Sequence, residues 1–457
     1  MNNSQAMLGR IWQALGGPAN YVAQVRETGE GSLSSAFAVT DFATASTAAA
    51  GLALAEFSSA CGAPGPDVTV DRRLSSLWFS KSIRPLGWSL PPQWDSVAGD
   101  YEARDGWIRL HTNAPHHRKA ALTVLGVEED RARVAAAVIR WSAADLESAI
   151  VAANGCAAQM RSLDDWRMHP QGVAVSAEPL VSMAATGPRR TSGATFRRER
   201  PLAGVRVLDL TRVLAGPVAT RFLAGYGAEV LRIDPPGWDE PAVLPEVTLG
   251  KRRARLDLRT PQDRGTFEAL LARADVLVHG YRSDALAGLG YDADRIDKIS
   301  PGLVDVALDA YGWSGPWAGR RGFDSLVQMS TGLAERGMRL SGGAKPTPLP
   351  VQALDYGTGC LMAAAALRGL TGRTLSGHGV RARASLARTA AFLAEYPTEF
   401  REGGLTPEAD ADLSGAVEET SWGPAHRLKP PVSVSGAPMA WTLPAGPLGD
   451  SPAVFAP

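Results

Sequence analysis

The chain has 457 residues, 45% of them hydrophobic, which is typical of a globular protein with two or three domains. Lys+Arg and Asp+Glu both number 47, and the resulting formal net charge of zero argues against a general nucleic-acid binder. Three widely spaced cysteines favour a reducing cytoplasm and indicate neither a disulfide framework nor a zinc site. The Ala-rich run between Asp41 and Glu56 is too short to span a bilayer, so we expect a cytoplasmic protein without a membrane partner.

Composition and pattern divide the chain into five segments. Residues 1–96 are predicted to be mainly helical, and residues 97–185 to form a small α+β domain. The small, polar and basic residues 186–200 predict an exposed linker. Residues 201–396 alternate strands with helices, and the Gly- and Pro-rich residues 397–457 are predicted to return to the large domain as a tail.

The small domain is predicted to contain one strand and three helices. Its strand is expected at Gly106–His111, and its helices at Ala120–Leu125, Glu128–Ile139 and Ala143–Ala153. The large domain is predicted to contain repeated β-α units, with strands at Val205–Leu210, Glu229–Ile233, Asp275–His279 and Leu303–Leu308, and helices at Pro217–Gly225 and Pro261–Arg273.

Strands alternating with helices predict an α/β fold with a Rossmann-like, mostly parallel sheet covered on both faces. Ligands of such sheets bind outside the carboxyl ends of the strands. We therefore expect four loops to surround one crevice, namely Thr211–Pro217, Asp234–Gly237, Gly280–Ser283 and Asp309–Gly315.

General catalytic motifs do not appear: there is no P-loop, no GxSxG and no HExxH. The first strand of the large domain is followed by TRVLAGP instead of GxGxxG, so no dinucleotide site is expected. Asp234 after the second strand could contact a ribose, although a turn role before Pro-Pro-Gly is favoured. His111, His116 and His117 lack partners at metal-ligand spacing, so no metal site is predicted and solvated or capping roles are favoured.

An ordered set of segments resembles the family III CoA-transferases, which include formyl-CoA transferases, carnitine CoA-transferases and α-methylacyl-CoA racemases. The set extends from Pro201 to about Tyr396 and comprises PLAGVRVLDLTRVLAGPVATRFLAGYGAEVLRID, GKRRARLDLRTP, ADVLVHGYRSDALAGLGY, ISPGLVDVALDAYGWSGPWAGRRGFDSLVQMSTGLAERG and PLPVQALDYGTGCLMAAAALRGL. The resemblance implies transfer of CoA from an acyl-CoA to a carboxylic acid. It further implies a CoA thioester as substrate, no permanently bound cofactor, and an interlocked homodimer.

The resemblance places the family's nucleophile at Asp355, just before an Ala-rich helix. A carboxylate can attack a thioester without a base, and an aspartyl-CoA intermediate would follow. Gly357 and Gly359 are predicted to let substrate approach the backbone, and N–H groups at the helix start to stabilise developing oxyanions. The alternative is that Asp355 only caps the helix.

The same resemblance assigns contacts to CoA. Arg259 suits a phosphate and Tyr281 suits the face of a base, although either could be an ordinary surface arginine or packed tyrosine. Gly280, Gly288 and Pro235 depart from residues frequent in the family, which keeps a non-catalytic CoA-binding protein open as an alternative. The residues aligned with CoA contacts are Arg212, Val213, Leu214, Ala215, Leu256, Arg259 and Tyr281.

A second alternative is an acyl-CoA racemase or isomerase of the same superfamily. The racemase branch carries a Gly-His-Asp triplet before the aspartate helix, because it must move an α-proton. Here the triplet is Gly322-Phe323-Asp324, and a phenylalanine cannot act as acid or base. Transfer is therefore favoured over racemisation. The small domain closes over the active site in this family, so its histidines could contribute to acyl-group recognition.

An internal repeat places Asp41 opposite Asp355 and Thr44 opposite Thr358. The segment AFAVTDFATASTAAAGLALAEF resembles PVQALDYGTGCLMAAAALRGL, and GPDVTVDRRLSSLWF resembles GHGVRARASLARTAAFL. Residues 97–183 resemble the family's small domain, which ordinarily follows the aspartate helix. We interpret the chain as a fused, permuted arrangement, in which Asp41, flanked by alanines instead of glycines, belongs to a structural copy.

Overall fold

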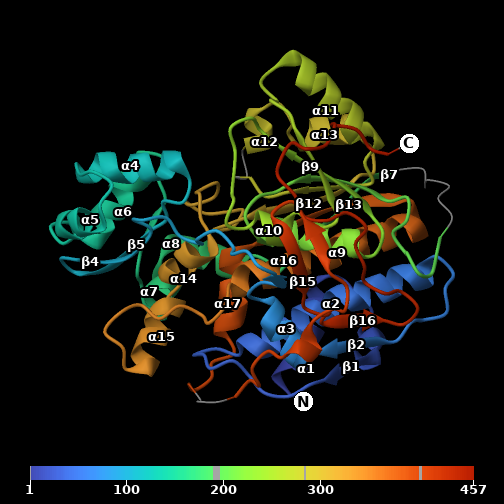
Figure 1. The fold of residues 1–457 in the computed structure, drawn as a ribbon, viewed down its shortest axis with the longest axis horizontal. Coiled ribbons are helices and arrows are strands. Elements are labelled where there is room, and N and C mark those ends of the chain that lie inside the picture. The colour runs from blue at the N-terminus through green and yellow to red at the C-terminus, as the bar shows by residue number, and fades with distance from the viewer. Residues whose placement is uncertain (1, 189–195, 282–284, 401–403, 457) are drawn as a thin grey trace.

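The computed structural model describes residues 2–188, 196–281, 285–400 and 404–456. The predicted linker and the end of the predicted loop at Gly280–Ser283 therefore lie partly outside the described residues. A seven-stranded sheet forms the centre of the molecule, in the order β10-β9-β8-β11-β12-β13-β7 (Figure 1). Its strands are β7 (Ser182–Pro188), β8 (Arg206–Leu210), β9 (Glu229–Asp234), β10 (Lys251–Arg255), β11 (Val276–His279), β12 (Val304–Asp309) and β13 (His378–Ser385).

Six of these strands are parallel, and only β7 pairs antiparallel, with β13. Successive side chains of a strand point to opposite faces of the sheet, so they enter two different hydrophobic cores. Val207 and Val276 enter the core that contains α2, α9 and α16, whereas Leu208 and Leu277 enter the opposite core. The predicted α/β sheet, covered on both faces, is confirmed.

The helices that cover the sheet divide between these two cores. On one face lie α9 (Ala215–Gly225) and α16 (Ala353–Ser376), with α2 (Val39–Ala60) packed against α16. On the other lie α11 (Pro261–Arg273), α12 (Ala285–Gly288) and α13 (Ala293–Ile299). Alanines fill much of α2 and α16, and their small side chains allow the two buried helices to pack closely.

A second, smaller sheet repeats the last part of the first. Strand β1 (Val25–Thr28) leads through α2 to the parallel strand β2 (Val68–Asp71), just as β12 leads through α16 to the parallel strand β13. Strand β16 (Val432–Val434) pairs antiparallel with β2, as β7 does with β13. Each half of the chain therefore provides the outer strand of the sheet that the other half builds.

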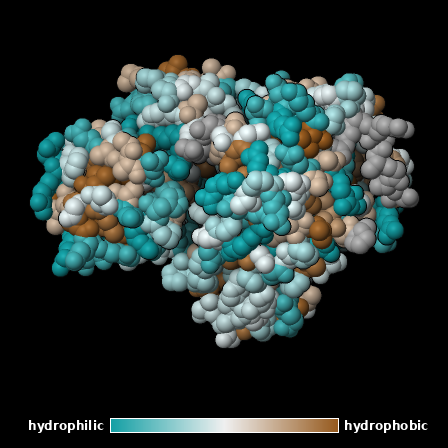
Figure 2. Space-filling view, turned by 90° about the horizontal axis from the view of Figure 1, so that it is seen from above, coloured by the Kyte–Doolittle hydropathy of each residue, from teal (hydrophilic) through white to brown (hydrophobic). Residues whose placement is uncertain are grey.

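The predicted small α+β domain is present as a lobe at one end of the molecule (Figures 1 and 2). Its sheet contains β4 (Gly99–Ala103), β5 (Gly106–Leu110) and β6 (Ala157–Gln159), covered by α4 (Pro115–Leu125), α5 (Arg131–Val138) and α6 (Ala143–Ala152). Helix α4 begins earlier than predicted because Pro115 suits the first turn. Helix α5 begins later, because the Asp130 side chain caps it.

The remaining elements connect these bodies. The N-terminal segment adds α1 (Asn3–Ala14), η1 (Ala19–Gln24), α3 (Arg72–Trp78) and β3 (Ile83–Pro85). The middle of the chain adds α7 (Leu163–Met168), α8 (Pro170–Ala177), α10 (Leu244–Val247), α14 (Asp324–Ser330), α15 (Leu333–Ser341) and α17 (Leu386–Ala394). The tail adds η2 (Asp410–Asp412), β14 (Glu418–Thr420) and β15 (Gly423–Arg427). Within the described ranges, no helix is long and apolar enough to cross a membrane.

Candidate active site

A cavity of about 530 Å³ follows the carboxyl ends of the central strands. Each of the four loops predicted to surround a crevice contributes to it, through Arg212, Asp234, Tyr281 and Asp309 among others. Residues after β10 and β13 extend the cavity toward the two sides of the sheet. The prediction that these four loops surround one crevice is therefore confirmed. The volume of the cavity suits a small-molecule ligand.

The loop after β8 has an unusual backbone. Val213 adopts a φ of 62°, which is costly for a β-branched residue, and its N–H donates a 3.0 Å hydrogen bond to Glu240. The guanidinium of Arg212 lies 4.1 Å from the ring centroid of Trp238 and 4.6 Å from that of Tyr281. The loop therefore holds Arg212 between two aromatic rings at the wall of the cavity.

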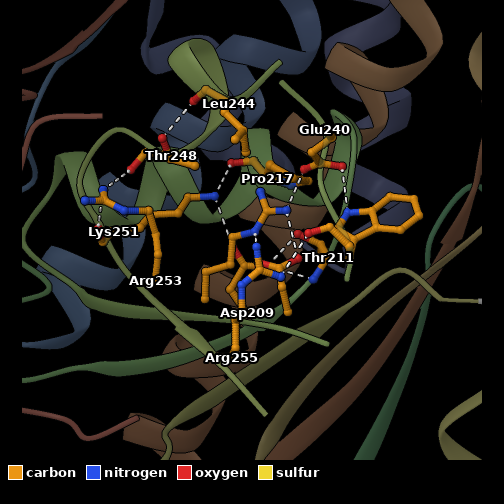
Figure 3. Close-up of polar contacts among 12 residues, drawn as sticks. Asp209, Thr211, Pro217, Glu240, Leu244, Thr248, Lys251, Arg253 and Arg255 are labelled. Carbon is orange, nitrogen blue, oxygen red and sulfur yellow. Dashed lines mark hydrogen bonds and ion pairs between the residues drawn. The ribbon is translucent and has the colours of Figure 1, made fainter. Parts of the chain in front are cut away.

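Beneath this loop lies a buried polar network (Figure 3). The Lys251 ammonium donates 3.0 Å hydrogen bonds to the Asp209 carboxylate and to the Pro217 carbonyl. Asp209 also accepts hydrogen bonds from Thr211 and Thr220. Burial opposes ionisation of Asp209, but the charges of Lys251 and Arg232 and the hydrogen bonds from the two threonines together outweigh it and lower the carboxyl pKa. A fully bonded network of this kind fixes the conformation of the loop above it.

Asp355 lies in the first turn of α16 and faces the same cavity. The helix begins after an inverse γ-turn at Gln352, with φ −78° and ψ 63°, in which the Ala353 N–H donates to the Val351 carbonyl at 2.8 Å. Asp355 is 7% exposed, so the carboxyl group is almost removed from water although it borders the cavity. The sequence prediction thus places Asp355 together with the loops after the strands.

A second carboxyl group, that of Asp324 at the start of α14, supports this helix start. Its Oδ2 accepts 3.0 Å hydrogen bonds from the N–H groups of Leu354 and Asp355, and Gln328 donates to its Oδ1. The first N–H groups of α16 are thereby satisfied by a side chain from another helix. The predicted use of this helix start as an oxyanion site is wrong for these two N–H groups, because both already donate to Asp324.

The two carboxyl groups influence each other's ionisation. Burial raises the pKa of Asp324 to about 6, although hydrogen bonds from Gln328 and the backbone oppose the change. Burial, and then the negative charge of Asp324, raise the pKa of Asp355 well above its ordinary value. Two neighbouring carboxyl groups in a water-poor site cannot both ionise easily, so protons are lost from the pair instead of from independent groups.

The two glycines after Asp355 do not border open space. A Cβ on Gly357 would meet the ring of Phe42 at 2.1 Å, and one on Gly359 would meet the Ala215 carbonyl oxygen at 2.5 Å. The prediction that they let substrate approach the backbone is therefore wrong. They allow α2 and α9 to approach α16 instead.

The predicted CoA contacts mostly meet in the cavity. Arg212, Val213, Ala215, Leu256, Arg259 and Tyr281 line it together with Asp355. Leu214 is instead buried in the hydrophobic core at the start of α9. Asp234 is fully buried and its carboxylate pairs with Arg232 at 2.8 Å, in agreement with the favoured structural role. Arg259 is largely exposed at the rim and pairs with Asp257.

The small domain completes the cavity from the other side. His116 and His117, at the start of α4, line it beside Arg320, Arg321 and Phe323. The ring of Phe323 stacks on His111 with centroids 3.7 Å apart. Sequence reasoning noted the histidines but missed Arg321 and the role of Asp324. The only available signal was their position beside the Gly-Phe-Asp triplet.

Comparison with known proteins identifies a family for part of the chain. The sequence pattern of CoA-transferase family III matches residues 202–417, which contain the central sheet except β7 and the whole of α16. Residues 202–417 belong to CoA-transferase family III. Within the part of the chain that the structure describes, no group of three or more His, Cys, Asp or Glu residues could hold a metal ion.

Several CoA-transferases resemble parts of this chain. A succinyl-CoA:glutarate CoA-transferase of Mus musculus is 32% identical over 242 residues, covering 50% of this chain and 52% of that protein. An acyl-CoA transferase of Gibberella moniliformis is 30% identical over 347 residues, which cover 68% of this chain and 60% of that protein. The protein in the crystal structure of Rv3272 from Mycobacterium tuberculosis has 32% sequence identity. The match covers 43% of this chain and 56% of that chain, with a TM-score of 0.40. The chain thus spans 52% and 60% of the length of these two curated relatives.

Proposed function

We propose that the protein is a CoA-transferase that moves CoA from an acyl-CoA to a carboxylic acid through an aspartyl-CoA intermediate. The observation that carries the proposal is the position of Asp355 in a cavity shared with the loops after the parallel strands. Its support is the family membership of residues 202–417 and the transferase names of the similar proteins. The substrates are a CoA thioester and a carboxylic acid, with no permanently bound cofactor.

The reaction consists of four acyl exchanges. The Asp355 carboxylate attacks the thioester carbonyl, which forms a mixed anhydride and releases CoA thiolate. The thiolate attacks the aspartyl carbonyl, giving aspartyl-CoA and the donor's free carboxylate. The acceptor carboxylate then attacks the aspartyl thioester, forming a second anhydride and again releasing thiolate. Attack of this thiolate on the acceptor's acyl carbonyl yields the new acyl-CoA and restores Asp355.

The cavity gives each part of CoA a place in this scheme. We assign the nucleotide to the end lined by Leu256, Arg259 and Tyr281, where an apolar wall, a cation and an aromatic ring meet. We assign the pantetheine arm to the loop of Arg212, Val213 and Ala215, with the buried Leu214 acting only through the fixed loop. The thioester then reaches Asp355.

The ionisation of Asp355 sets a condition on the first step. Only the carboxylate is nucleophilic, and burial together with Asp324 favours the protonated form. A carboxylate that is poorly solvated is, however, a stronger nucleophile than one surrounded by water. We therefore propose that Asp355 attacks from a small ionised population, and that attack relieves the repulsion between the two carboxyl groups.

Two alternatives differ in what they require of this cavity. A racemase or isomerase needs an acid or base at the substrate α-carbon, and Phe323 occupies the position of the racemase histidine. A non-catalytic CoA-binding protein needs no exposed nucleophile, whereas Asp355 faces the cavity. The transferase is therefore favoured over both.

The domain arrangement extends the proposal. We propose that residues 1–96 contain a degenerate copy of the aspartate-helix region, that residues 97–185 are the small domain and that residues 201–396 bind CoA and perform catalysis. Residues 397–457 form a tail that returns to the large domain. The matching units β1-α2-β2 and β12-α16-β13 support an internal duplication. A homodimer and a cytoplasmic location remain predictions, which sedimentation equilibrium and cell fractionation would test.

Intact-protein mass spectrometry tests the proposed reaction. The protein is incubated with a panel of acyl-CoAs, and a covalent CoA adduct is expected for the true donor. Hydroxylamine should convert the adduct to a hydroxamate that peptide mapping assigns to Asp355. CoA binding without an adduct for any donor would contradict the transferase proposal and favour one of the alternatives.

A further inference from the structure

A second cavity, of about 190 Å³, is lined mainly by residues of α7, α8 and α17. In the described parts of the chain, its lining shares no residue with that of the main cavity, which contains Asp355. The proposed reaction uses none of the residues that line the second cavity. Its volume is below that of a typical cofactor site, so it suits a ligand of a few heavy atoms.

Part of the second cavity is apolar. Ala390, Ala391 and Ala394 of α17 line it together with Leu163 of α7. Contact with these side chains removes hydrocarbon from water, which is favourable. The lining therefore favours a ligand with a short hydrocarbon part over a bare inorganic ion.

Arg388 of α17 brings a positive charge to this cavity. Its Nε donates a 2.7 Å hydrogen bond to the Glu178 carbonyl oxygen. Among the described residues, its two terminal nitrogens have no hydrogen-bond partner and no carboxylate forms an ion pair with it. Burial lowers the pKa of Arg388, although the negative charge of Glu395 opposes the change. A bound anion would supply both the missing counter-charge and the missing acceptors.

The other charged residues of this lining are already paired. Arg167 pairs with Asp164 at 2.8 Å, and Glu395 pairs with Arg10 at 2.7 Å. Arg388 therefore differs from both of them, and the charge that the second cavity leaves without a partner is positive.

A buried hydrogen-bond donor lines the same cavity. Trp166 is 5% exposed, and its indole N–H has no hydrogen-bond partner among the described residues. The ring of His169 stacks on Trp166 at an interplanar angle of 12°, which holds the indole in place. An unbonded N–H removed from water is unfavourable, and an oxygen atom of a ligand would satisfy it.

Two helices connect the second cavity to the main cavity. Helix α14 begins at Asp324, which accepts the N–H of Asp355, and the next residue after this helix, Thr331, lines the second cavity. Helix α17 begins at Leu386, which lines the main cavity, and ends at Ala394, which lines the second. A ligand that shifts either helix in the second cavity would therefore also shift groups beside Asp355.

We propose that the second cavity binds a short-chain carboxylate through Arg388 and Trp166, and that its occupancy alters the main site through α14 and α17. A carboxylate offers two oxygens to these two donors, and its hydrocarbon part contacts the alanines of α17. Inorganic phosphate is also an anion but has no hydrocarbon part. Binding is independent of the reaction, whereas the effect on the main site rests on the proposed function.

NMR spectroscopy tests the binding with three small probes. These are butyrate, its uncharged isostere butyramide, and inorganic phosphate. The protein carries an NMR-active nitrogen isotope in its tryptophans, and the indole resonance of Trp166 is assigned by its loss in Trp166→Phe. Butyrate is expected to shift this resonance, whereas butyramide and phosphate at the same concentration should not. Butyramide or phosphate as effective as butyrate would overturn the proposed ligand.

Variants of the lining test the location of the ligand. Arg388→Gln should weaken butyrate binding, followed at the Trp166 resonance, by about 10-fold or more, and Arg388→Lys should retain part of the affinity. Arg339→Gln is the matched control, because Arg339 is an exposed arginine outside both cavities that pairs with Glu335 at 2.7 Å. Ala391→Leu fills the cavity and should abolish the shift.

Thermal melting shows which variants are folded, and Ala391→Leu keeps the test decisive if Arg388→Gln does not fold. No shift in the wild type would overturn the site. Equal affinity of the wild type and a folded lining variant would also overturn it, because butyrate would then act on Trp166 from the main cavity.

The rate of CoA-adduct formation tests the effect on the main site. Butyrate is itself an acid and could accept CoA, so the wild type is compared with Arg388→Gln. Their rates should agree within about twofold without butyrate and differ by about fivefold or more with it. Equal rates with butyrate would overturn the coupling through α14 and α17. Absence of any adduct would contradict the proposed function, but the NMR result would still decide whether the second cavity binds a carboxylate.

Discussion

The two aspartate helices begin alike and differ in what surrounds the aspartate. Both α2 and α16 follow an inverse γ-turn, at Ala38 with φ −71° and ψ 58° and at Gln352 with φ −78° and ψ 63°. Asp41 and Asp355 occupy the third position of their helices. This agreement extends the sequence repeat to the backbone.

The two aspartates differ in the residue that lies near them from the helix after the next strand, which follows β2 in one copy and β13 in the other. Arg72, the first residue of α3, pairs with Asp41 at 2.7 Å. Leu386, the first residue of α17, lines the cavity beside Asp355. One helix start is neutralised by a fixed cation, whereas the other lies next to a second carboxyl group and open space. The same backbone therefore holds an aspartate paired with an arginine in one copy and, in the other, the cavity-lining aspartate that we propose as the nucleophile.

The largest expected effect comes from removing each aspartate in turn. Loss of Asp355 should affect turnover, whereas loss of Asp41 should affect stability. Asp355→Ala is expected to lower turnover by about 10³-fold or more, because no other group forms the covalent intermediate. Asp41→Ala should leave turnover within about twofold and lower the free energy of unfolding by about 1–3 kcal/mol, since Arg72 keeps Glu27 but loses the nearer of its two carboxylate partners. Steady-state kinetics and urea denaturation measure both. Comparable loss of turnover in the two variants would contradict the assignment of roles.

An arginine can be placed where the structural copy has one. Leu386→Arg should pair with Asp355 and hold it as an unreactive carboxylate, lowering kcat/KM by about 10²-fold. Leu386→Met keeps the volume and apolar character and is expected to remain within a few-fold of wild type. Mass spectrometry of the CoA adduct should show the loss only in the arginine variant. Undiminished adduct in a folded Leu386→Arg protein would argue against charge as the distinguishing feature.

The carboxyl pair should be visible in the pH profile. The nucleophile must be ionised, and the pKa of Asp355 is raised. The rate of adduct formation should therefore increase with pH, and this rising limb of the pH profile should lie well above the ordinary pKa range of aspartate. Asp324→Asn keeps an acceptor for the N–H groups of Leu354 and Asp355 but removes the like charge. The limb should therefore move to lower pH. An unchanged limb would show that Asp324 acts only as a helix support.

The smallest expected effect comes from exchanging glycine and alanine at the matched positions 359 of α16 and 45 of α2, and it is an effect on stability. Gly359→Ala would bring a Cβ within 2.5 Å of the Ala215 carbonyl oxygen, and we expect it to destabilise the protein by about 1–3 kcal/mol. At the matching position of α2, Ala45→Gly should cost about 1 kcal/mol through lost helix propensity. Chemical denaturation measures each change. Stabilisation by Gly359→Ala would show that the contact with α9 is loose.

Local patterns predicted the sheet and the position of Asp355 at the cavity. The short β-branched runs at Val205–Leu210 and Leu303–Leu308 correspond to β8 and β12 within one residue, because a parallel strand buried on both faces is mostly apolar. Asp355 could be identified from its surrounding motif, and the loops after the strands from the topology rule.

Features that depend on distant packing could not be predicted. The occupants of the space beside Gly357 and Gly359 come from α2 and α9, far away in the sequence. The pairing of Arg72 with Asp41 depends on how β2 and α3 pack beside α2. Arg321 and His117 come from different domains, and only the closed cavity brings them together.

The exchange of outer strands between the two halves has a consequence for folding. Strand β7 precedes the large domain in the chain yet closes the sheet of α16, and β16 follows that domain yet closes the sheet of α2. Neither sheet has its edge until segments far apart in the sequence have met, and β2 and β16 are separated by most of the chain. Such high contact order slows folding and leaves two unpaired edges exposed meanwhile. A nascent chain would thus remain vulnerable to aggregation until its last strand emerges, which makes chaperone dependence an expected trait of this protein.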